Sequence, residues 1–379
     1  MSASTSRENN DQEREVIEAD DTATQRDVFA SDLFGKVLAA MEVATVYVGD
    51  RLGLYEALAE GGWKTSSELA AITGTNERYL REWLEQQAVV GVLHVDYLGP
   101  DAGSRRYRLP ASHTEVLLGR DSLQYLAPMA RFTVGILSPI QQLLQAFKSG
   151  AGVPYAAYGA DAREGQADAN RPIFINLLAK VWLPAIPDVH ERLLNSPSAR
   201  VADIGCGTGW SSIAMARAYP QITVDGYDLD EPSIAIARSS AAEAGVSDRV
   251  RFHVHDASDS ALIGQYDLVT AFECIHDMGR PVDALTVMRG LAVKGGAVIV
   301  ADERVDETFS APGDEIERLM YGWSVLFCQP TSLADSPSMG TGTVMRPDVL
   351  RTYAGQAGFR DVEVLPIEHD FWRLYRLIV

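Results

Sequence analysis

The segment VADIGCGTGW, residues 201–210, limits what this chain can fold into more than any other stretch. A short apolar run ends in Asp203 and is followed by Gly205, Gly207 and Gly209. Glycine lets the backbone turn at positive φ and lets a ligand approach it closely. The next residues, WSSIAMARAY, are typical of a helix whose first N–H groups have no partner within the helix. The segment therefore predicts a strand, a loop and a helix that hold a ligand at the strand's carboxyl end.

Apolar strands alternate with helical segments along the C-terminal half of the chain. After the first strand, 199–205, further strands are expected at 222–229, 249–256, 266–273 and 295–302. This alternation predicts a mainly parallel sheet with helices on both faces. We therefore expect an α/β domain with a Rossmann-like sheet over residues 196–379.

The N-terminal part is expected to be mainly helical and is divided into three regions. Residues 1–28 are polar and acidic and are predicted to be a disordered tail. Residues 29–112 show the order helix, turn, helix, hairpin of a winged helix, with a capping-box spacing at Thr65 and Glu68 and a helix stop at Gly74. Residues 113–195 are expected to form a helical linker that covers a substrate.

Charge and composition exclude several classes of protein. The net charge of −19 disfavours binding to nucleic acid or to an anionic membrane surface. Neither an apolar run of membrane-spanning length nor a signal-peptide pattern is found, so a cytoplasmic protein is expected. The cysteines at 206, 274 and 328 are too far apart in the sequence for a typical zinc site or disulfide framework.

Three classes of ligand use a glycine loop of this kind. A P-loop would need a lysine that is absent here, and the GxGxG spacing is one residue short of the dinucleotide fingerprint GxGxxG. S-adenosylmethionine needs a carboxylate for its ammonium group, which Asp203 could supply. Asp228 ends the second strand, where an acid binds ribose hydroxyls, and Asp256 ends the third, where it could accept from an adenine amine. Spacing alone leaves the dinucleotide and the methyl donor open.

The motifs VADIGCGTGWSSIAMARAYP, VDGYDLDEPSIAIA, RVRFHVHDAS, YDLVTAFECIHDM and LAVKGGAVIVADE resemble, in this order, those of the class I S-adenosylmethionine-dependent methyltransferases. The resemblance covers residues 198–305 and favours the methyl donor over a dinucleotide. It implies that the cofactor is contacted by Asp203, Gly205, Gly207, Asp228, Leu229, Asp256, Ala257 and Phe272.

The fourth strand is followed by His276 and Asp277, and the fifth strand ends at Asp302. A hydroxyl acceptor must lose its proton during methyl transfer, and histidine can accept it near neutral pH. The pattern is similar to small-molecule O-methyltransferases with an N-terminal winged-helix dimerisation domain. The resemblance implies His276 as the general base, supported by Asp277 and Asp302. Met278 stands where that family often has tryptophan.

A second resemblance is to bacterial regulator-like methyltransferases, carried by TSLADSPSMGTGT and HDFWRLYRL. Some of these relatives methylate carbon and bind iron. The position of their second histidine is occupied here by Phe327-Cys328-Gln329, so we expect no metal. The helix ERLMYGWSVLFCQP resembles the family's lid, which makes Met320, Trp323 and Phe327 the expected acceptor pocket for an aromatic or polyketide-like molecule.

Three functions remain open on the sequence. The first is an enzyme that methylates a small molecule on oxygen or, alternatively, on the carbon of a 2-oxo acid. The second is a transcriptional regulator, but the second helix of the winged unit carries Glu77, Arg78, Arg81, Glu82 and Glu85, a poor surface for phosphates. The third is an inactive protein that only binds the cofactor. We expect the winged unit to form a homodimer and to bind no nucleic acid.

Overall fold

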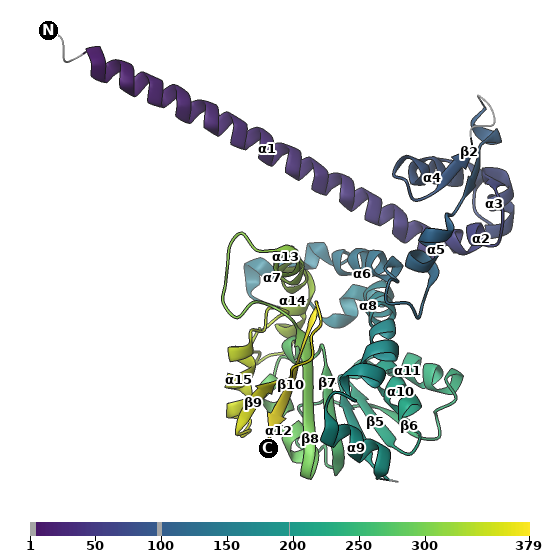
Figure 1. Cartoon of the computed structure of the whole chain (residues 1–379), viewed down its shortest axis with the longest axis vertical. Coiled ribbons are helices and arrows are strands. Elements are labelled where there is room, and N and C mark those ends of the chain that lie inside the picture. Colours follow the sequence, from purple (N-terminus) through teal and green to yellow (C-terminus); the bar gives the residue numbers. More distant parts are fainter. Residues whose placement is uncertain (1–4, 97–100, 197) are drawn as a thin grey trace. The chain divides into compact units, whose positions relative to one another are not determined.

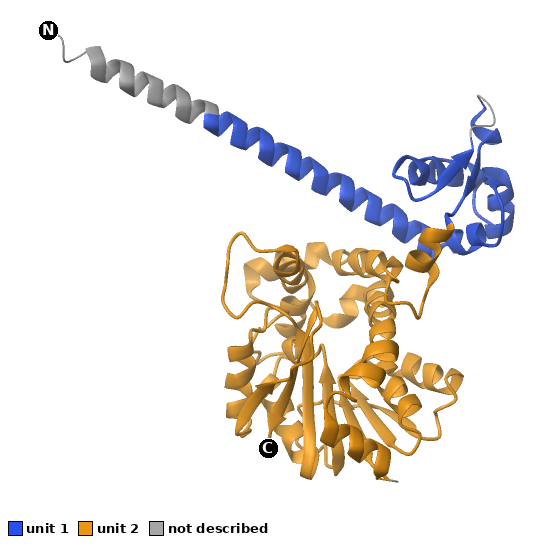
Figure 2. Ribbon diagram, viewed as in Figure 1, with its two compact units in different colours: residues 1–110 blue, residues 111–379 orange. Residues whose placement is uncertain are grey.

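The computed structural model describes residues 21–96, 101–196 and 198–379 in full and residues 5–20 by their backbone alone. It divides into two compact units, residues 1–110 and residues 111–379, which are described separately (Figure 2).

Unit 1 combines a long helix with a small winged-helix arrangement. Helix α1 (Thr5–Arg51) is followed by α2 (Leu54–Ala59), β1 (Lys64–Thr65), α3 (Ser66–Thr73), α4 (Glu77–Val89), β2 (His94–Asp96), η1 (Ala102–Ser104) and β3 (Arg106–Arg108). The strands form a sheet in the order β1-β3-β2. The predicted capping box is confirmed: Thr65 accepts from the N–H of Glu68, whose carboxylate accepts from the N–H of Thr65. Gly74 ends α3 in the left-handed conformation, as predicted.

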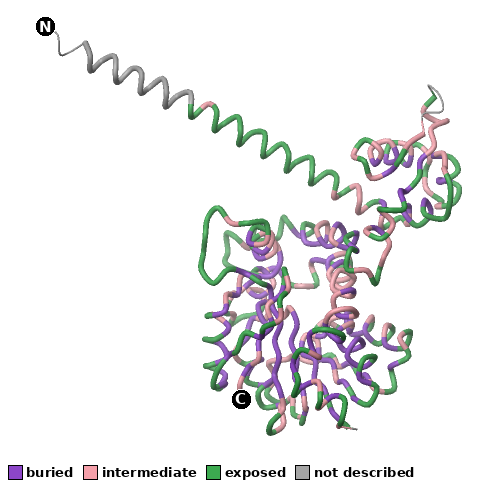
Figure 3. Tube along the Cα trace, in the orientation of Figure 1, coloured by how far each residue is buried: buried purple, intermediate pink, exposed green. Residues whose placement is uncertain are grey.

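The disordered tail is a wrong prediction for residues 21–28, which belong to α1. Nothing is described of residues 1–4, nor of the side chains up to residue 20. The segment TATQRDVF contains neither glycine nor proline, so each of its residues costs less than about 1 kcal/mol in a helix, and α1 can include them without burial. The described part of α1 is largely exposed along its length (Figure 3).

Unit 2 is built on a seven-stranded sheet in the order β6-β5-β4-β7-β8-β10-β9 (Figure 1). The strands are β4 (Arg200–Ile204), β5 (Thr223–Asp228), β6 (Val250–Val254), β7 (Tyr266–Phe272), β8 (Ala292–Glu303), β9 (Asp361–Val364) and β10 (Trp372–Ile378). The first five are parallel, as predicted, whereas β10 runs antiparallel to both β8 and β9. Parallel strands place their carboxyl ends at one edge, so the predicted site residues at the ends of β4, β5, β6 and β7 share that edge.

Helices cover both faces of this sheet. On one face, α9 (Pro187–Asn195), α10 (Trp210–Ala218) and α11 (Glu231–Glu243) share an apolar core with the strands. On the other, α12 (Pro281–Leu291) and α15 (Pro347–Gln356) share a second core. The alternation is visible in β8, where Ile299 belongs to the first core and Val298 and Val300 belong to the second. Such alternation follows from the period of two in a strand.

A helical layer lies next to the carboxyl edge of the sheet in unit 2. It contains α5 (Ala111–Leu118), α6 (Ala127–Leu137), α7 (Ile140–Ser149), η2 (Tyr155–Tyr158), α8 (Gly159–Ile173) and the π-helical η3 (Phe174–Trp182). Further short elements follow β7 and β8: η4 (Ile275–Asp277), α13 (Glu315–Trp323), the π-helical η5 (Ser324–Cys328) and α14 (Gln329–Ser332). Their own core includes Phe132, Tyr158 and Phe327.

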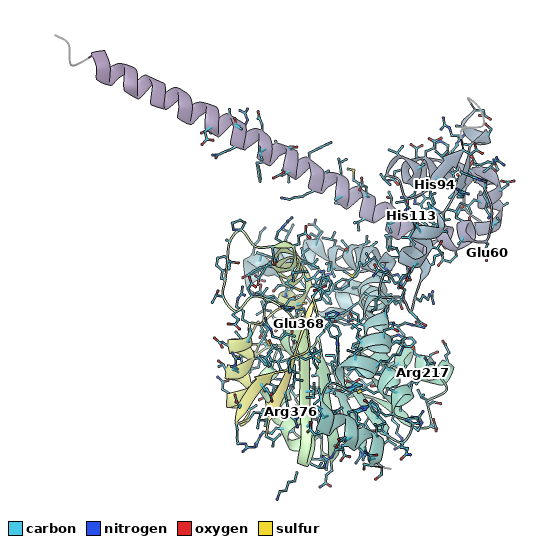
Figure 4. All side chains as sticks on the ribbon, viewed as in Figure 1. Glu60, His94, His113, Arg217, Glu368 and Arg376 are labelled. Carbon is cyan, nitrogen blue, oxygen red and sulfur yellow. The ribbon has the colours of Figure 1, made fainter. Side chains whose placement is uncertain are left out.

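Arg376 on β10 reaches α9, where its guanidinium makes a bidentate contact with Asp188 at 2.9 and 2.5 Å (Figure 4). This contact ties the antiparallel strand, which the sequence did not predict, to a helix that covers one face of the sheet. In the described part of the chain, no single helix has the length and apolar character needed to cross a membrane. One bent pair of helical segments, Tyr155–Trp182 and Pro187–Asn195, has this length and apolar character only when the two segments are taken together.

Candidate active site

A cavity of about 680 Å³ opens at the carboxyl ends of β4, β5, β6 and β7. Its walls come from the loop after β4, the ends of the next three strands, helix α8 and the segment 331–337. Of the residues predicted to contact a cofactor, those on its wall are Gly205, Gly207, Asp228, Leu229, Asp256, Ala257 and Phe272. Asp277 also lies on the wall.

The glycine loop after β4 is closed by hydrogen bonds to the neighbouring strand. The N–H groups of Gly205 and Cys206 donate to the carbonyl of Tyr227 at 2.8 and 3.1 Å. Gly205 has φ 65°, and a Cβ there would lie 2.6 Å from the sulfur of Cys274. Gly207 has φ 52°, and a Cβ there would meet no atom within 4 Å. The loop thus needs glycine at 205 for packing, and at 207 it leaves the backbone open to the cavity.

Asp203 is placed differently from the prediction. Its side chain is fully buried, and its carboxylate accepts from the hydroxyls of Ser211 (2.6 Å), Ser212 (2.7 Å) and Thr270 (2.8 Å). Burial raises its pKa, while these hydrogen bonds lower it. Asp203 is not among the described residues that line the cavity, so it joins β4 to α10 and β7 beneath the loop instead of facing a ligand. The sequence predicted that Asp203 would bind the ammonium group of a ligand. In the structure, the hydroxyls of Ser211 and Ser212 on α10 bind this carboxylate instead.

Asp228 at the end of β5 is both a wall residue and a support for the loop. Its two carboxylate oxygens accept from the N–H of Gly207 and the N–H of Asp230, both at 2.8 Å. Burial raises the pKa of this carboxyl. Each oxygen keeps lone pairs for a further donor, so the carboxylate can hold the loop and accept from a ligand hydroxyl at once.

Asp256, after β6, accepts from the N–H and hydroxyl of Ser258 at 2.8 and 2.6 Å and from Arg280 at 2.7 Å. Partial burial raises its pKa, but the Ser258 hydrogen bonds and the charge of Arg280 lower it below its usual value overall. The carboxylate is therefore ionised at neutral pH and oriented at the end of the cavity next to β6.

His276 lies in η4 with its ring between three carboxylates. Nδ1 is 2.7 Å from Asp302 Oδ1 and 3.0 Å from Glu303 Oε2, and Nε2 is 3.1 Å from Asp277 Oδ1. Burial lowers the pKa of His276, but Asp302, Glu303 and Asp277 together raise it well above its usual value. These neighbours thus favour the cationic form of the imidazole, with a proton on each ring nitrogen. Burial raises the pKa of Asp302, but the charge of His276 and the hydrogen bonds that Asp302 accepts together lower it by more. The pKa of Asp302 is therefore below its usual value, which favours the ionised form of this carboxylate beside His276.

The structure brings the three predicted catalytic residues together but gives only one of them a place on the wall. His276 and Asp302 are each 1% exposed, and neither is among the described residues lining the cavity. Asp277 lies on the wall and contacts the imidazole. Donor atoms of His276, Asp277 and Cys328 lie within 4.8 Å of one another, a proximity that the sequence did not reveal. The expectation that no metal is bound stays a prediction.

The acceptor-pocket residues expected on the lid helix lie elsewhere. Met320 and Phe327 are fully buried, and Phe327 packs edge-on against Phe132 and Tyr158 at 5.4 and 4.8 Å between ring centroids. Trp323 packs against the same core. None of the three is among the described residues that line the cavity. The rings of Trp323 and Phe327 attach α13 and η5 to α6, and Phe327 also contacts η2.

Several wall residues were missed by the sequence reasoning. They come from the helical layer, from the end of β7 and from the loop after α14: Tyr155, Arg163, Gln166, Asn170, Phe174, Glu273, Cys274 and residues 335–337. Residues 113–195 were expected only to be a helical linker that covers a substrate, and α8, which begins at Gly159, brings several of these residues to the cavity. The run of alanine, arginine, glutamate and glutamine after Gly159 is a helix-forming signal that could have shown this.

Comparison with known proteins identifies the domains of the chain. The profile of a methyltransferase domain matches residues 195–328, and that of an Rv2258c-like winged HTH domain matches residues 39–120. A ubiquinone biosynthesis O-methyltransferase of Aromatoleum aromaticum is 29% identical over 198 residues, which are 52% of this chain and 76% of that protein. The protein of the same name from Bordetella bronchiseptica is 38% identical over 110 residues, 29% of this chain and 45% of that protein. The chain thus covers less than half of the second relative.

Solved structures share the fold across both units. A putative O-methyltransferase of Nostoc punctiforme is 21% identical with a TM-score of 0.64, covering 91% of this chain and 97% of that one. Human N-acetylserotonin methyltransferase in complex with S-adenosylmethionine is 17% identical with a TM-score of 0.65, covering 91% and 96%. The mitomycin 7-O-methyltransferase is 22% identical with a TM-score of 0.63, covering 94% and 99%. Together with the glycine loop and the acids at the strand ends, these findings show an S-adenosylmethionine-dependent methyltransferase that combines a methyltransferase domain, matched over residues 195–328, with an Rv2258c-like winged HTH domain, matched over residues 39–120.

Proposed function

We propose that this enzyme transfers the methyl group of S-adenosylmethionine to a hydroxyl group of a small aromatic or polyketide-like metabolite, of the kind made in secondary metabolism. The observation that carries the proposal is the single cavity that joins the glycine loop, Asp228 and Asp256 to Asp277 of the His276 group. The names of the curated relatives and of several similar structures support oxygen as the methylated atom.

The charge of the cavity suits a positively charged donor. Its wall carries the acids Asp228, Asp230, Asp256, Glu273, Asp277 and Asp335. The arginines on the wall are already paired: Arg163 with Asp230 at 2.6 Å, and Arg280 with Asp256 at 2.7 Å. A sulfonium and an ammonium gain from such surroundings because opposite charges attract strongly where water is excluded. An acceptor without negative charge fits the same wall better than an anionic one.

We assign the adenosyl end to Asp228 and Asp256 and the methionine end to the glycine loop. The acceptor oxygen attacks the methyl carbon in line, the C–S bond breaks with its electrons on sulfur, and the acceptor proton must be removed. We propose His276 as the base, supported by Asp302. Since Asp277 stands between the imidazole and the cavity, it must move aside or relay the proton. His276 must also first lose its own proton, so the reaction should speed up as pH rises above neutral.

The regulator alternative receives no support from the charges of unit 1. Arg78 pairs with Glu82 at 2.5 Å, and Arg81 lies 3.6 Å from Glu77. In the wing, Arg105 pairs with Glu85 and Arg106 with Asp96, at 2.7 and 2.8 Å. Arginines already opposed by carboxylates are poor partners for phosphates. We therefore propose that unit 1 binds no nucleic acid.

We propose instead that unit 1 forms a cytoplasmic homodimer through α1. Phe34, Met41 and Val48 recur every seven residues on this helix and are 63%, 62% and 38% exposed. Positions seven apart share one face of a helix, and an exposed apolar face of this kind fits a second copy.

The proposed reaction is tested by incubating the protein with methyl-labelled S-adenosylmethionine and a panel of phenols, polyketides and 2-oxo acids. Labelled methyl ethers are the expected products. Label bound to carbon would indicate the alternative acceptor class. Known methyltransferases that accept the compounds of the panel are run in parallel as positive controls. If the protein binds the cofactor tightly but transfers the methyl group to none of these compounds, the proposed function is contradicted.

A further inference from the structure

Glu273, the residue after β7, has an unusual backbone for its type. Its φ of 50° makes it the one non-glycine residue with positive φ in the described part of the chain. This conformation is unfavourable for a residue with a side chain and persists only where the surroundings hold it. Here the N–H of Glu273 donates to the carbonyl of Ala301 at 2.8 Å. The structure thus holds Glu273 in an unfavourable backbone conformation at the wall of the cavity.

The carboxyl group of Glu273 lies on the cavity wall and is held from two sides. The amide of Asn170 on α8 donates to Oε2, and the side chain of Trp372 on β10 makes a second hydrogen bond. Neither partner brings a positive charge. The carboxyl is therefore held in place by hydrogen bonds alone.

The charged groups near Glu273 belong to the His276 cluster. The charge of His276 lowers the pKa of Glu273, whereas that of Asp302 on β8 raises it. Glu303, also on β8, interacts electrostatically with Glu273 as well. Burial is the largest influence and brings the pKa of Glu273 to about 8. Burial thus favours the protonated form of this carboxyl.

The order of the strands places Glu273 at the methionine end of the proposed donor site. Asp256, Asp228 and Gly205 follow the adjacent strands β6, β5 and β4, and Glu273 follows the next strand, β7. Its neighbour Cys274 packs directly against Gly205. A donor with adenine at Asp256, ribose at Asp228 and methionine at the glycine loop therefore has its sulfonium, which lies between ribose and methionine, on the side of Glu273.

We propose that Glu273 recognises the positive charge of the donor sulfonium, releasing a proton when S-adenosylmethionine binds and regaining one when S-adenosylhomocysteine is left. This inference rests on the proposed position of the donor. Methyl transfer breaks the C–S bond with both electrons on sulfur, so the donor loses its positive charge while the acceptor gives up a proton. A carboxylate that has lost its counter-ion takes up a proton, and the cavity then holds the spent cofactor less tightly than the donor.

Calorimetric titration in buffers of different ionisation enthalpy counts the protons released on binding. At pH 7 we expect about one proton per S-adenosylmethionine and close to none for S-adenosylhomocysteine. In Glu273→Gln the release should disappear, because the amide keeps the shape but cannot ionise. The preference for donor over product should fall roughly tenfold or more, since a contact with a charged group contributes at that level.

Asp335→Asn is the matched control, because Asp335 is another acid on the cavity wall outside this group. It should leave the proton release unchanged. Equal proton release in wild type and Glu273→Gln would overturn the inference, as would equal release on binding donor and product. If Glu273→Gln does not fold, sinefungin decides in the wild type, because its amine is charged where the product is neutral: it should release a proton as the donor does. Failure of the wild type to bind either nucleoside would instead contradict the proposed site.

Discussion

The Nδ1 atom of His276 lies 2.7 Å from Oδ1 of Asp302, and both side chains are almost completely buried. The two residues are separated by 26 positions and come from η4 and the end of β8, which the parallel pairing of β7 and β8 brings side by side. A buried imidazole next to an ionised carboxylate is fixed in orientation, and its protonated form is stabilised. The pair gives the proposed base a defined geometry at the edge of the cavity.

His276→Ala should leave S-adenosylmethionine binding intact and lower turnover of a hydroxyl acceptor by roughly 10²–10⁴-fold. Wild-type turnover should rise as pH increases above 7, because the imidazole must first lose its proton, and the variant should lack this rise. His253→Ala is a suitable control, since His253 is partly exposed on β6 and stacks on Tyr227. If turnover is unaffected in His276→Ala, His276 is not the general base.

Asp228→Ala should remove most of the affinity for S-adenosylmethionine, because the ribose hydroxyls and the N–H of Gly207 lose the same acceptor. Calorimetry measures the change. Asp225→Ala on the same strand should have little effect on binding, since Asp225 pairs with Arg200 and contacts Tyr266 away from the cavity wall. Equal affinities of the two variants would argue against the ribose site.

Ser212→Ala should destabilise unit 2 by about 1–3 kcal/mol, because the buried carboxylate of Asp203 loses a hydrogen bond that nothing replaces. Denaturant unfolding followed by circular dichroism measures this. Ser239→Ala, on the exposed side of α11, removes only a hydrogen bond to Glu243 and should change stability by less than about 0.5 kcal/mol. Similar losses in both variants would contradict the structural role assigned to Asp203.

The stability of the protein should fall as pH rises from about 4.5 to 8 through the contribution of Glu273. Its pKa is raised from the ordinary 4.5 to about 8 in the folded state. The native state therefore binds more protons than the unfolded state in this window, and the free energy of unfolding decreases with pH. His276 acts in the same direction above its ordinary pKa of 6.5.

Glu273→Gln should flatten this decline, which melting temperatures measured across the window would show. The carboxylates with lowered pKa, such as Asp302, lose their stabilising effect only in more acidic solutions, so they do not mask the result. An unchanged slope in Glu273→Gln would mean that the burial of this carboxyl is relieved in solution.

Phe34→Glu together with Met41→Glu should convert the proposed dimer into a monomer, because two charges would enter its apolar face. Sedimentation velocity reports the change. Gln25→Glu, on the polar part of α1, should leave the dimer intact. A wild-type protein that sediments as a monomer at micromolar concentration would end this proposal.

The sequence alone identified the five parallel strands and the winged-helix order of unit 1, whereas the cofactor class followed from the resemblance of its motifs to those of known methyltransferases. These features depend on signals that are local in the chain: alternating apolar runs, capping residues and the glycine loop. The antiparallel pair β9 and β10 was missed, because Val362 and Leu374 stand in segments that gain strand structure only from their pairing with each other and with β8.

Which side chains face the cavity was decided by the tertiary structure. From its place at a strand end, Asp203 could point to a ligand or to α10, and the hydroxyls of Ser211 and Ser212 turn it inward. Likewise, the apolar spacing of Trp323 and Phe327 suits a pocket as well as a core, and their contacts with Phe132 of α6 make them part of a core. In the sequence, nothing distinguishes Glu273 from other acidic residues that follow a strand. Only the fold brings it the hydrogen bond from Asn170, which lies more than 100 residues earlier in the chain. Periodicity fixes the type of element a segment forms, whereas the direction of a polar side chain depends on partners that only folding brings near.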